Sequence, residues 1–197
     1  AATPRREFGA LWDRSGTRVF FVVDMPQFQI FDAAASGSGP PRLLLEGMRD
    51  QIPLDVSPDG RWLLYLQEME SLGLLPLARP QDARLFRGIE GQQSFARFSP
   101  DGRFIAFQSD ASGRDEIYVR TIAEDGRSLP VSRAGGQQPR WTKSGEVFYW
   151  QGDQLVAVPV RTAPALQVGE PRALFRAERG ASRAFFEAAY DVSADGR

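Results

Sequence analysis

The sequence contains neither cysteine nor histidine. Without cysteine, disulfide bonds and thiolate chemistry are excluded. Without histidine, the chain lacks the commonest general base, the commonest zinc ligand and every histidine-containing catalytic triad. Nucleophile-elbow, P-loop and dinucleotide-binding motifs are missing as well. We therefore expect no catalytic residue, no metal site and no cofactor. Acidic residues are plentiful, so a carboxylate pair for glycoside chemistry stays an open alternative.

An excess of charge of either sign is also missing. The chain has 24 basic and 25 acidic residues among 197, a net charge of −1. This balance predicts no nucleic-acid partner and no anionic membrane partner by electrostatics. No apolar run approaches the roughly 20 residues of a membrane span. The opening "AATPRREFG" lacks the charged-then-apolar order of a signal peptide. We expect no membrane segment within this chain.

What the sequence does contain is one short turn that recurs. "SPDGR" stands at 57–61 and again at 99–103, with the variants "RSGTR" at 14–18, "KSGEV" at 143–147 and "SADGR" at 193–197. The glycines of these turns are spaced by roughly 40–45 residues, with one longer last step, and that period is typical of a four-stranded propeller blade.

The residues around each turn repeat as well. Aromatic side chains stand five residues after four of the turn glycines: Phe21, Tyr65, Phe107 and Trp150. The intervening positions are also apolar, so this strand is hydrophobic on both faces, as expected where sheets are covered on both sides. The runs are short and punctuated by Gly and Pro, which favours strands over buried helices. Trp12 and Trp141 share a repeat position four residues before the glycine, and we expect both in the core.

The fold class is therefore predicted as all-β: a β-propeller of four-stranded antiparallel blades, with about four blades plus one extra strand. We expect one domain over 1–197, with repeat units at approximately 8–50, 51–92, 93–136, 137–187 and, incomplete, 188–197. Strands are predicted near 8–12, 18–23, 28–32 and 42–45; 53–57, 61–67, 72–77 and 83–86; 95–99, 103–109, 115–121 and 128–132; 138–142, 146–150, 154–160 and 172–175; and 188–193. The segments 34–41 and 161–171 are predicted as loops, and 175–188 as a short helix or loop.

The acidic residues of the turns have a structural explanation. Ser57-Pro58-Asp59-Gly60 fits a type I turn, with serine first, proline second and glycine last. We interpret Asp59 and Asp101 as turn formers and not as catalytic carboxylates. Asp110, Arg114, Asp115 and Glu116 form a charged cluster, for which a solvated turn is favoured over a calcium site because no EF-hand spacing is present.

At these turns the sequence resembles the TolB-like propeller repeat. "ARFSPDGRFIAFQSDASGRDEIYVRTI" at 96–122 follows that repeat closely, and "PRWTKSGEVFYWQGDQLVAVPV" at 139–160 is similar to its closing blades. The resemblance implies a bacterial sensor propeller of the kind fused to serine/threonine kinases or regulators, in an extracytoplasmic or periplasmic location. Such propellers usually close with six blades, so we expect a fragment of a longer chain or completion by a second copy. Unit 51–92 lacks the usual third-strand residues, which leaves that strand uncertain.

Three polar stretches precede the predicted innermost strands: "MRDQIP" at 48–53, "EGQQSF" at 90–95 and "AGGQQPRW" at 134–141. In a propeller these loops share one face near the central channel, and amides that both donate and accept suit a peptide backbone or a sugar. The predicted binding residues are Gln51, Gln92, Gln93, Gln137, Gln138 and Arg140. The alternative is that they are solvated connectors that satisfy loop backbone groups. Phe185 and Phe186 either form an exposed hydrophobic contact for a partner or pack on the blade edge.

These observations favour a non-catalytic binding or sensing module with a protein or peptide partner. The alternative is the regulatory propeller of a prolyl-oligopeptidase-like serine hydrolase, whose catalytic domain this chain lacks. A third hypothesis is that the chain is a propeller fragment that associates with copies of itself through the unpaired strand edges of its outer blades.

Overall fold

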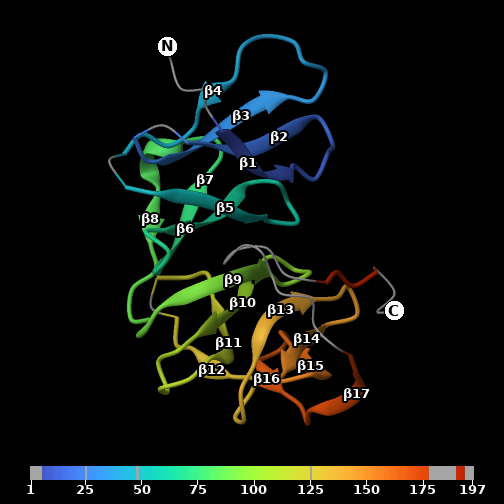
Figure 1. The fold of residues 1–197 in the computed structure, drawn as a ribbon. Helices are drawn as coiled ribbons and strands as arrows, with labels where there is room; N and C mark the ends of the chain where they lie inside the picture. Colours follow the sequence, from blue (N-terminus) through green and yellow to red (C-terminus); the bar gives the residue numbers. More distant parts are fainter. Residues whose placement is uncertain (1–5, 25, 48, 125, 178–189, 194–197) are drawn as a thin grey trace. The chain divides into compact units, whose positions relative to one another are not determined.

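The structure is a computed structural model that describes residues 6–24, 26–47, 49–124, 126–177 and 190–193 (Figure 1). In these ranges the regular elements are β-strands and one short 3₁₀ turn, η1 (Pro80–Asp82). The chain divides into two compact units, Ala1–Phe86 and Arg87–Arg197. Each unit is described by itself below.

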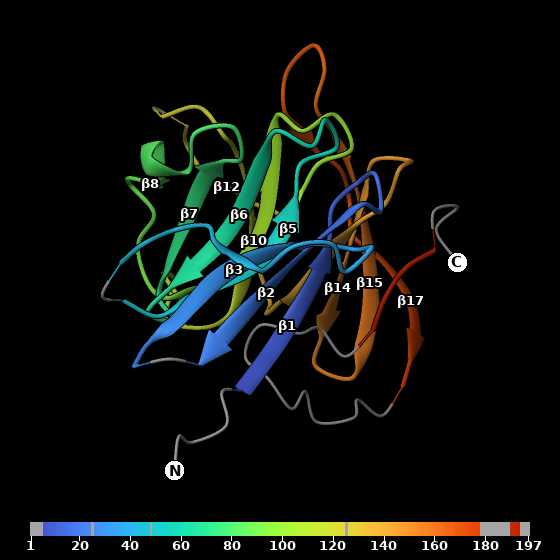
Figure 2. The same cartoon turned by 90° about the horizontal axis from the view of Figure 1, so that it is seen from above.

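Unit 1 contains two antiparallel four-stranded sheets in which strands follow one another in chain order. The first sheet has the order β1-β2-β3-β4, and β1, β2 and β3 run side by side in Figure 2. The second has the order β5-β6-β7-β8. The bounds are β1 (Arg6–Trp12), β2 (Arg18–Asp24), β3 (Phe28–Ala34), β4 (Arg42–Leu43), β5 (Gln51–Val56), β6 (Trp62–Gln67), β7 (Ser71–Pro76) and β8 (Arg84–Leu85).

Unit 2 contains one four-stranded and one five-stranded antiparallel sheet. One has the order β9-β10-β11-β12, and the other β13-β14-β15-β16, with β17 also paired to β15. The bounds are β9 (Gln93–Phe98), β10 (Phe104–Ser109), β11 (Glu116–Thr121), β12 (Leu129–Pro130), β13 (Gln137–Trp141), β14 (Glu146–Gln151), β15 (Gln154–Arg161), β16 (Gln167–Val168) and β17 (Arg172–Arg176). The predicted all-β blades of four antiparallel strands are confirmed.

The core of each unit lies between its two sheets. In unit 1, Phe20 and Ile30 of the first sheet pack with Leu63 and Leu75 of the second, and all four side chains are fully buried. In unit 2, Ile117 and Val119 belong to a cluster with Val147, Tyr149 and Val156 across the two sheets. Burial of such side chains contributes about 25 cal/mol per Å² of apolar surface, which explains why the middle of the second strand of each sheet is apolar.

The two Ser-Pro-Asp-Gly turns close their innermost hairpins through the same hydrogen-bond network. The Gly60 amide donates to the Ser57 carbonyl at 2.9 Å. The Ser57 hydroxyl donates to Asp59 at 2.6 Å and accepts from the Trp62 amide at 2.9 Å. The same contacts recur over 99–104. Gly60 has a φ of 70°, which glycine adopts without strain. The aspartates therefore hold turns, as predicted.

Trp12 corrects one expectation, because its side chain is 58% exposed instead of lying in the core. Trp12 pairs with Val19, on the face of the sheet opposite Phe20. Its repeat equivalent, Trp141, packs partly buried on the unit 2 core, against the preceding sheet. This repeat position thus packs on the blade before it, and within the described residues of unit 1 no sheet precedes β1.

Two details differ from the strand prediction. The segment 161–171, expected as a loop, contains the two-residue strand β16. Residues 190–193, expected within a strand, carry no strand assignment. The uncertain third strand of the second sheet exists as β7. The prediction for 175–188 and the Phe185–Phe186 pair fall almost wholly outside the described residues.

Candidate functional site

Every innermost strand carries a β-bulge at one repeat position. The register with the neighbouring strand shifts between Phe8 and Leu11 in β1, and the same shift recurs in β5, β9 and β13. Gly9, Phe95 and Gln138 stand at this repeat position with φ values of 63°, 52° and 57°. In β5 the position is Pro53, whose ring holds φ negative. A bulge changes the direction of the side chains that follow it. The sequence analysis did not predict these bulges.

In unit 2 the bulges place two arginines at equivalent positions. Innermost strands β9 and β13 lie side by side (Figure 1). Arg97 of β9 and Arg140 of β13 directly follow the bulged residues, and both are half-buried. Arg97 donates to the Ala96 carbonyl at 2.8 Å. Two positive charges therefore share the innermost strands of this unit.

Tyr190 lies against one of these arginines. Arg140 donates to the Tyr190 carbonyl at 3.2 Å, and its guanidinium carbon lies 6.0 Å from the Tyr190 ring centroid. Burial raises the pKa of the Tyr190 phenol, although Arg140 and Arg97 oppose that shift. The Arg140 side chain also comes within 3.6 Å of the exposed Asp191 carboxylate. A partner with a carboxylate would have to compete with Asp191 for this cation.

Burial divides the predicted glutamines into two groups. Gln51, Gln93 and Gln138 are 3%, 6% and 7% exposed, so their side chains face protein and little solvent. The Gln93 side chain donates to the Gly91 carbonyl at 3.0 Å. Gln51 belongs to unit 1, and its side-chain oxygen is buried with no hydrogen-bond partner among the described residues. These three side chains hold or line the loops that precede the innermost strands.

The other two glutamines are more accessible. Gln92 is exposed, and its backbone amide donates to the Asp110 carboxylate at 2.7 Å. Gln137 is half-buried, and its side chain donates to Asp115 at 2.7 Å. The structure therefore brings Gln92 and Gln137 to the starts of two neighbouring strands, β9 and β13. Their part in ligand binding stays a prediction.

The acidic cluster at 110–116 is used in hydrogen bonding. Glu116 is 3% exposed and accepts from the Ser132 hydroxyl, from Arg114 at 2.6 Å and from the Gly135 amide at 3.0 Å. Burial opposes ionisation, but these donors more than compensate and lower the pKa of Glu116. The described part of the chain holds no group of three or more potential metal-ligating side chains.

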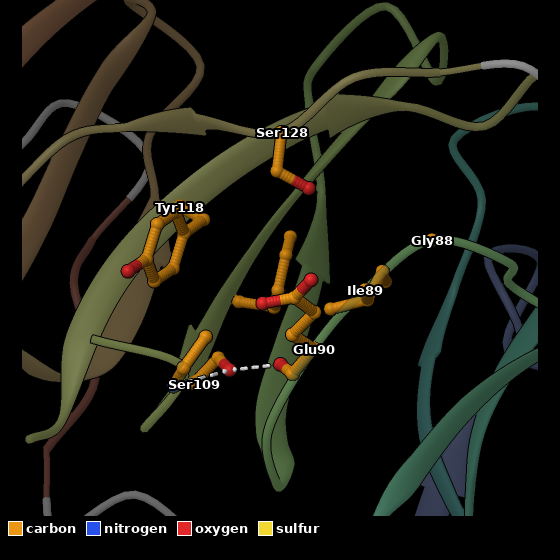
Figure 3. A pocket seen from close by; sticks show the side chains of 8 residues that line it. Gly88, Ile89, Glu90, Ser109, Tyr118 and Ser128 are labelled. Carbon is orange, nitrogen blue, oxygen red and sulfur yellow. Dashed lines mark hydrogen bonds between the residues drawn. The ribbon is translucent and has the colours of Figure 1, made fainter. Parts of the chain in front are cut away.

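A pocket that the sequence did not predict lies on the face of the β9–β12 sheet opposite the unit 2 core (Figure 3). Its volume is about 170 Å³, and its lining residues are Gly88, Ile89, Glu90, Phe107, Ser109, Ala111, Tyr118 and Ser128. Phe107 pairs with Tyr118 across β10 and β11, and their rings stack with centroids 5.8 Å apart. We call this cavity the Glu90 pocket. The one sequence signal near this pocket is Phe107, the aromatic residue of the repeat, and the repeat pattern predicts that residue to be in the core.

Comparison with known proteins supports the fold. No known family model matches the chain. TolB of Agrobacterium tumefaciens superimposes with a TM-score of 0.65 and 18% identity over 83% of this chain and 63% of its own. TolB of Acinetobacter baumannii gives 0.63 and 16%, over 87% and 44%. This chain has the TolB-like β-propeller fold.

The fold is also similar to part of a prolyl endopeptidase chain. A structure of two prolyl endopeptidases matches with a TM-score of 0.62 and 15% identity, over 88% of this chain and 30% of that one. Among curated sequences, dipeptidyl-peptidase 5 of Trichophyton tonsurans is 38% identical over 80 residues, which are 40% of this propeller and 11% of that protein. The probable dipeptidyl-peptidase 5 of Arthroderma benhamiae is 36% identical over a stretch of the same length. The propeller therefore matches about a tenth of the length of these peptidases.

Among the described residues, no helix has the length and apolarity to cross a bilayer.

Proposed function

We propose that this propeller is a non-catalytic binding or sensing module that recognises a protein segment or small ligand at the starts of its innermost strands. The observation that carries the proposal is the placement of Gln92 and Gln137 at the starts of the neighbouring strands β9 and β13, with Arg140 further along β13. Gln92 and Gln137 stand at or just before the first residues of the same strands.

The chemistry of these groups suits an extended peptide. Amide side chains donate and accept, so they can replace the hydrogen bonds of a peptide backbone. Guanidinium groups favour carboxylates through paired, charge-assisted hydrogen bonds. In this proposal Gln92, Gln137 and Arg140 contact the partner. The buried Gln51, Gln93 and Gln138 hold the loops in place.

The lack of histidine supports a role without catalysis by this chain, because a Ser-His-Asp triad cannot be assembled from it. We extend the proposal to the whole of 1–197 as one propeller domain. An extracytoplasmic location follows from the TolB-like resemblance and belongs to the same proposal.

Addition of a fluorophosphonate probe to the purified chain is expected to label no serine; labelling would contradict the non-catalytic role.

Peptide display against the immobilised chain tests the binding site directly. Selected peptides would be titrated by fluorescence anisotropy against wild type, Gln92→Ala, Gln137→Ala and Arg140→Ala. Loss of one such contact is expected to weaken binding by roughly five- to tenfold, as for a typical hydrogen bond to a charged or amide partner.

Gln167→Ala is the matched control, because Gln167 is an exposed glutamine on the outer strand β16. Its affinity is expected to equal that of wild type. Equal affinity of wild type and all three site variants for every selected peptide would reject this surface as the binding site.

A second function is favoured by the peptidase matches: a regulatory propeller that controls access to the active site of a serine hydrolase. The 38% identity over 80 residues to dipeptidyl-peptidase 5 is the specific observation behind it. The sequence encoded next to this chain decides between the two functions. A following α/β-hydrolase domain with a nucleophile elbow favours the regulatory propeller, and a kinase or DNA-binding domain favours the sensor.

A further inference from the structure

Two buried side chains hold the loop at 88–90 in place by hydrogen bonds to its backbone. Arg120 is fully buried and donates to the Arg87 carbonyl at 2.8 Å. Ser109 is 1% exposed, and its hydroxyl donates to the Glu90 carbonyl at 2.8 Å. These bonds hold the backbone on both sides of Gly88 and Ile89. The position of Glu90 is therefore set before any ligand arrives.

The Glu90 side chain is left available by this arrangement. Glu90 is exposed, and among the described side chains none forms an ion pair with its carboxylate. Figure 3 shows the carboxylate extending across the Glu90 pocket, with the Ser128 hydroxyl pointing into the same space. The Ser128 oxygen is buried and has no hydrogen-bond partner among the described residues. A buried hydroxyl without a partner is costly, so a ligand donor is favoured there.

The walls of the pocket are apolar. The ring of Tyr118, which stacks on the fully buried ring of Phe107, forms one side, and Ile89 and Ala111 add aliphatic surface. Aromatic ring faces attract cations, with most effect where water is excluded. The pocket thus combines one negative charge, one unpaired hydroxyl oxygen and an aromatic wall, in a volume of about 170 Å³.

We propose that the Glu90 pocket binds a primary alkylammonium group, such as a lysine side chain or a free amine of similar length. The ammonium has three donors, of which one meets the Glu90 carboxylate and another the Ser128 oxygen. The methylene chain packs on the Tyr118 ring and the Ile89 side chain. An anionic ligand is disfavoured because Glu90 repels it. None of these residues belongs to the peptide surface proposed above, so each proposal can fail independently.

The test is titration of the ¹⁵N-labelled chain with n-butylammonium chloride, followed by NMR. Shifts are expected for the amides of Gly88, Ile89, Glu90 and Ala111. Glu90→Gln keeps size and is exposed, so folding is preserved, and the affinity is expected to fall at least about fivefold through loss of a charge-assisted hydrogen bond. Glu46→Gln, an exposed glutamate of unit 1, is the control and should retain wild-type affinity.

Comparison ligands decide the chemistry. Butyrate and n-butanol are expected to cause no saturating shifts at 88–90, because neither carries the charge that Glu90 selects. Equal binding of butyrate, equal affinity of Glu90→Gln, or shifts confined to other residues would each overturn the proposal. Nα-acetyl-lysine methylamide is then compared with n-butylammonium, to distinguish a lysine side chain from a free amine as the source. Its Nε-acetylated form is the uncharged control.

Discussion

The ring of Tyr65 lies directly against Gly73 on the neighbouring strand. The two residues pair across β6 and β7, and a Cβ atom placed on Gly73 would stand 2.1 Å from the Tyr65 Cζ atom. Tyr65 is 3% exposed, and burial raises the pKa of its phenol to about 12. Gly73 makes room for the aromatic residue of the strand beside it.

The substitution Gly73→Ala is expected to destabilise unit 1 by about 2–3 kcal/mol, the cost of forcing a methyl group into a packed core. Urea unfolding followed by tryptophan fluorescence measures the change. In a Tyr65→Leu background the same substitution should cost much less, because the clashing ring is gone. Equal costs in the two backgrounds would contradict the proposed contact.

Acid is expected to weaken the fold through the turn aspartates. Burial opposes the charge on Asp101, but hydrogen bonds from Ser99, Thr162 and Arg103 more than compensate and lower its pKa from 3.8 to about 2. Because the folded-state pKa is depressed, the stabilisation is present above pH 4 and is lost as the pH falls towards 2. Urea unfolding of wild type at pH 7, 4 and 2.5 is expected to reveal this loss.

Asp101→Asn isolates that contribution. The variant should be about 1–2 kcal/mol less stable than wild type at pH 7, and the difference should shrink as the pH falls towards 2. Asp153→Asn, which removes a 59% exposed carboxylate paired with Arg176, is the control and should change stability by at most about 0.5 kcal/mol. A difference for Asp101→Asn that stays constant with pH would refute the assignment.

Calcium is expected to have no effect on thermal stability. Glu116 is already occupied by Ser132, Arg114 and the Gly135 amide, and Asp115 accepts from Gln137. Calcium needs six to eight oxygen ligands, and these carboxylates are committed to protein donors. Scanning calorimetry in millimolar CaCl₂ and in EDTA should give the same midpoint. A rise in the midpoint with calcium would show that the cluster binds metal.

Tyr190 is expected to fasten the short described segment 190–193 to the last sheet. Its hydroxyl lies 2.9 Å from both the Gln138 and the Phe148 carbonyl oxygens, and its ring packs edge-on against Trp150 with centroids 5.7 Å apart. Tyr190→Phe should cost about 1 kcal/mol by removing one buried hydrogen bond, measured by urea unfolding. Tyr118→Phe, at a half-exposed position, should cost close to nothing; equal costs would count against the role of Tyr190.

The repeat made the sheets predictable, whereas the position and burial of the candidate binding residues were only partly predictable. The residues that precede each innermost strand were recognised from spacing, and the structure places Gln92 and Gln137 at the starts of neighbouring strands. Arg97 was not recognised, because the bulge that re-aims it depends on a positive φ at Phe95, which the residue type disfavours. Likewise Gln93 and Gln138 look polar and accessible in the sequence but are buried by the loops around them.

The strands, the turns and the blade period could be predicted from the sequence alone, because they depend on local chemistry: apolar runs of strand length, and Ser-Pro-Asp-Gly turns that satisfy their own backbone groups. Which of the repeated side chains are covered depends instead on how the sheets pack. Trp12 and Trp141 occupy the same repeat position, yet one is exposed and the other packs on a neighbouring sheet. Exposure depends on which sheet lies against a residue, and the Glu90 pocket likewise arises from side chains that only folding brings together.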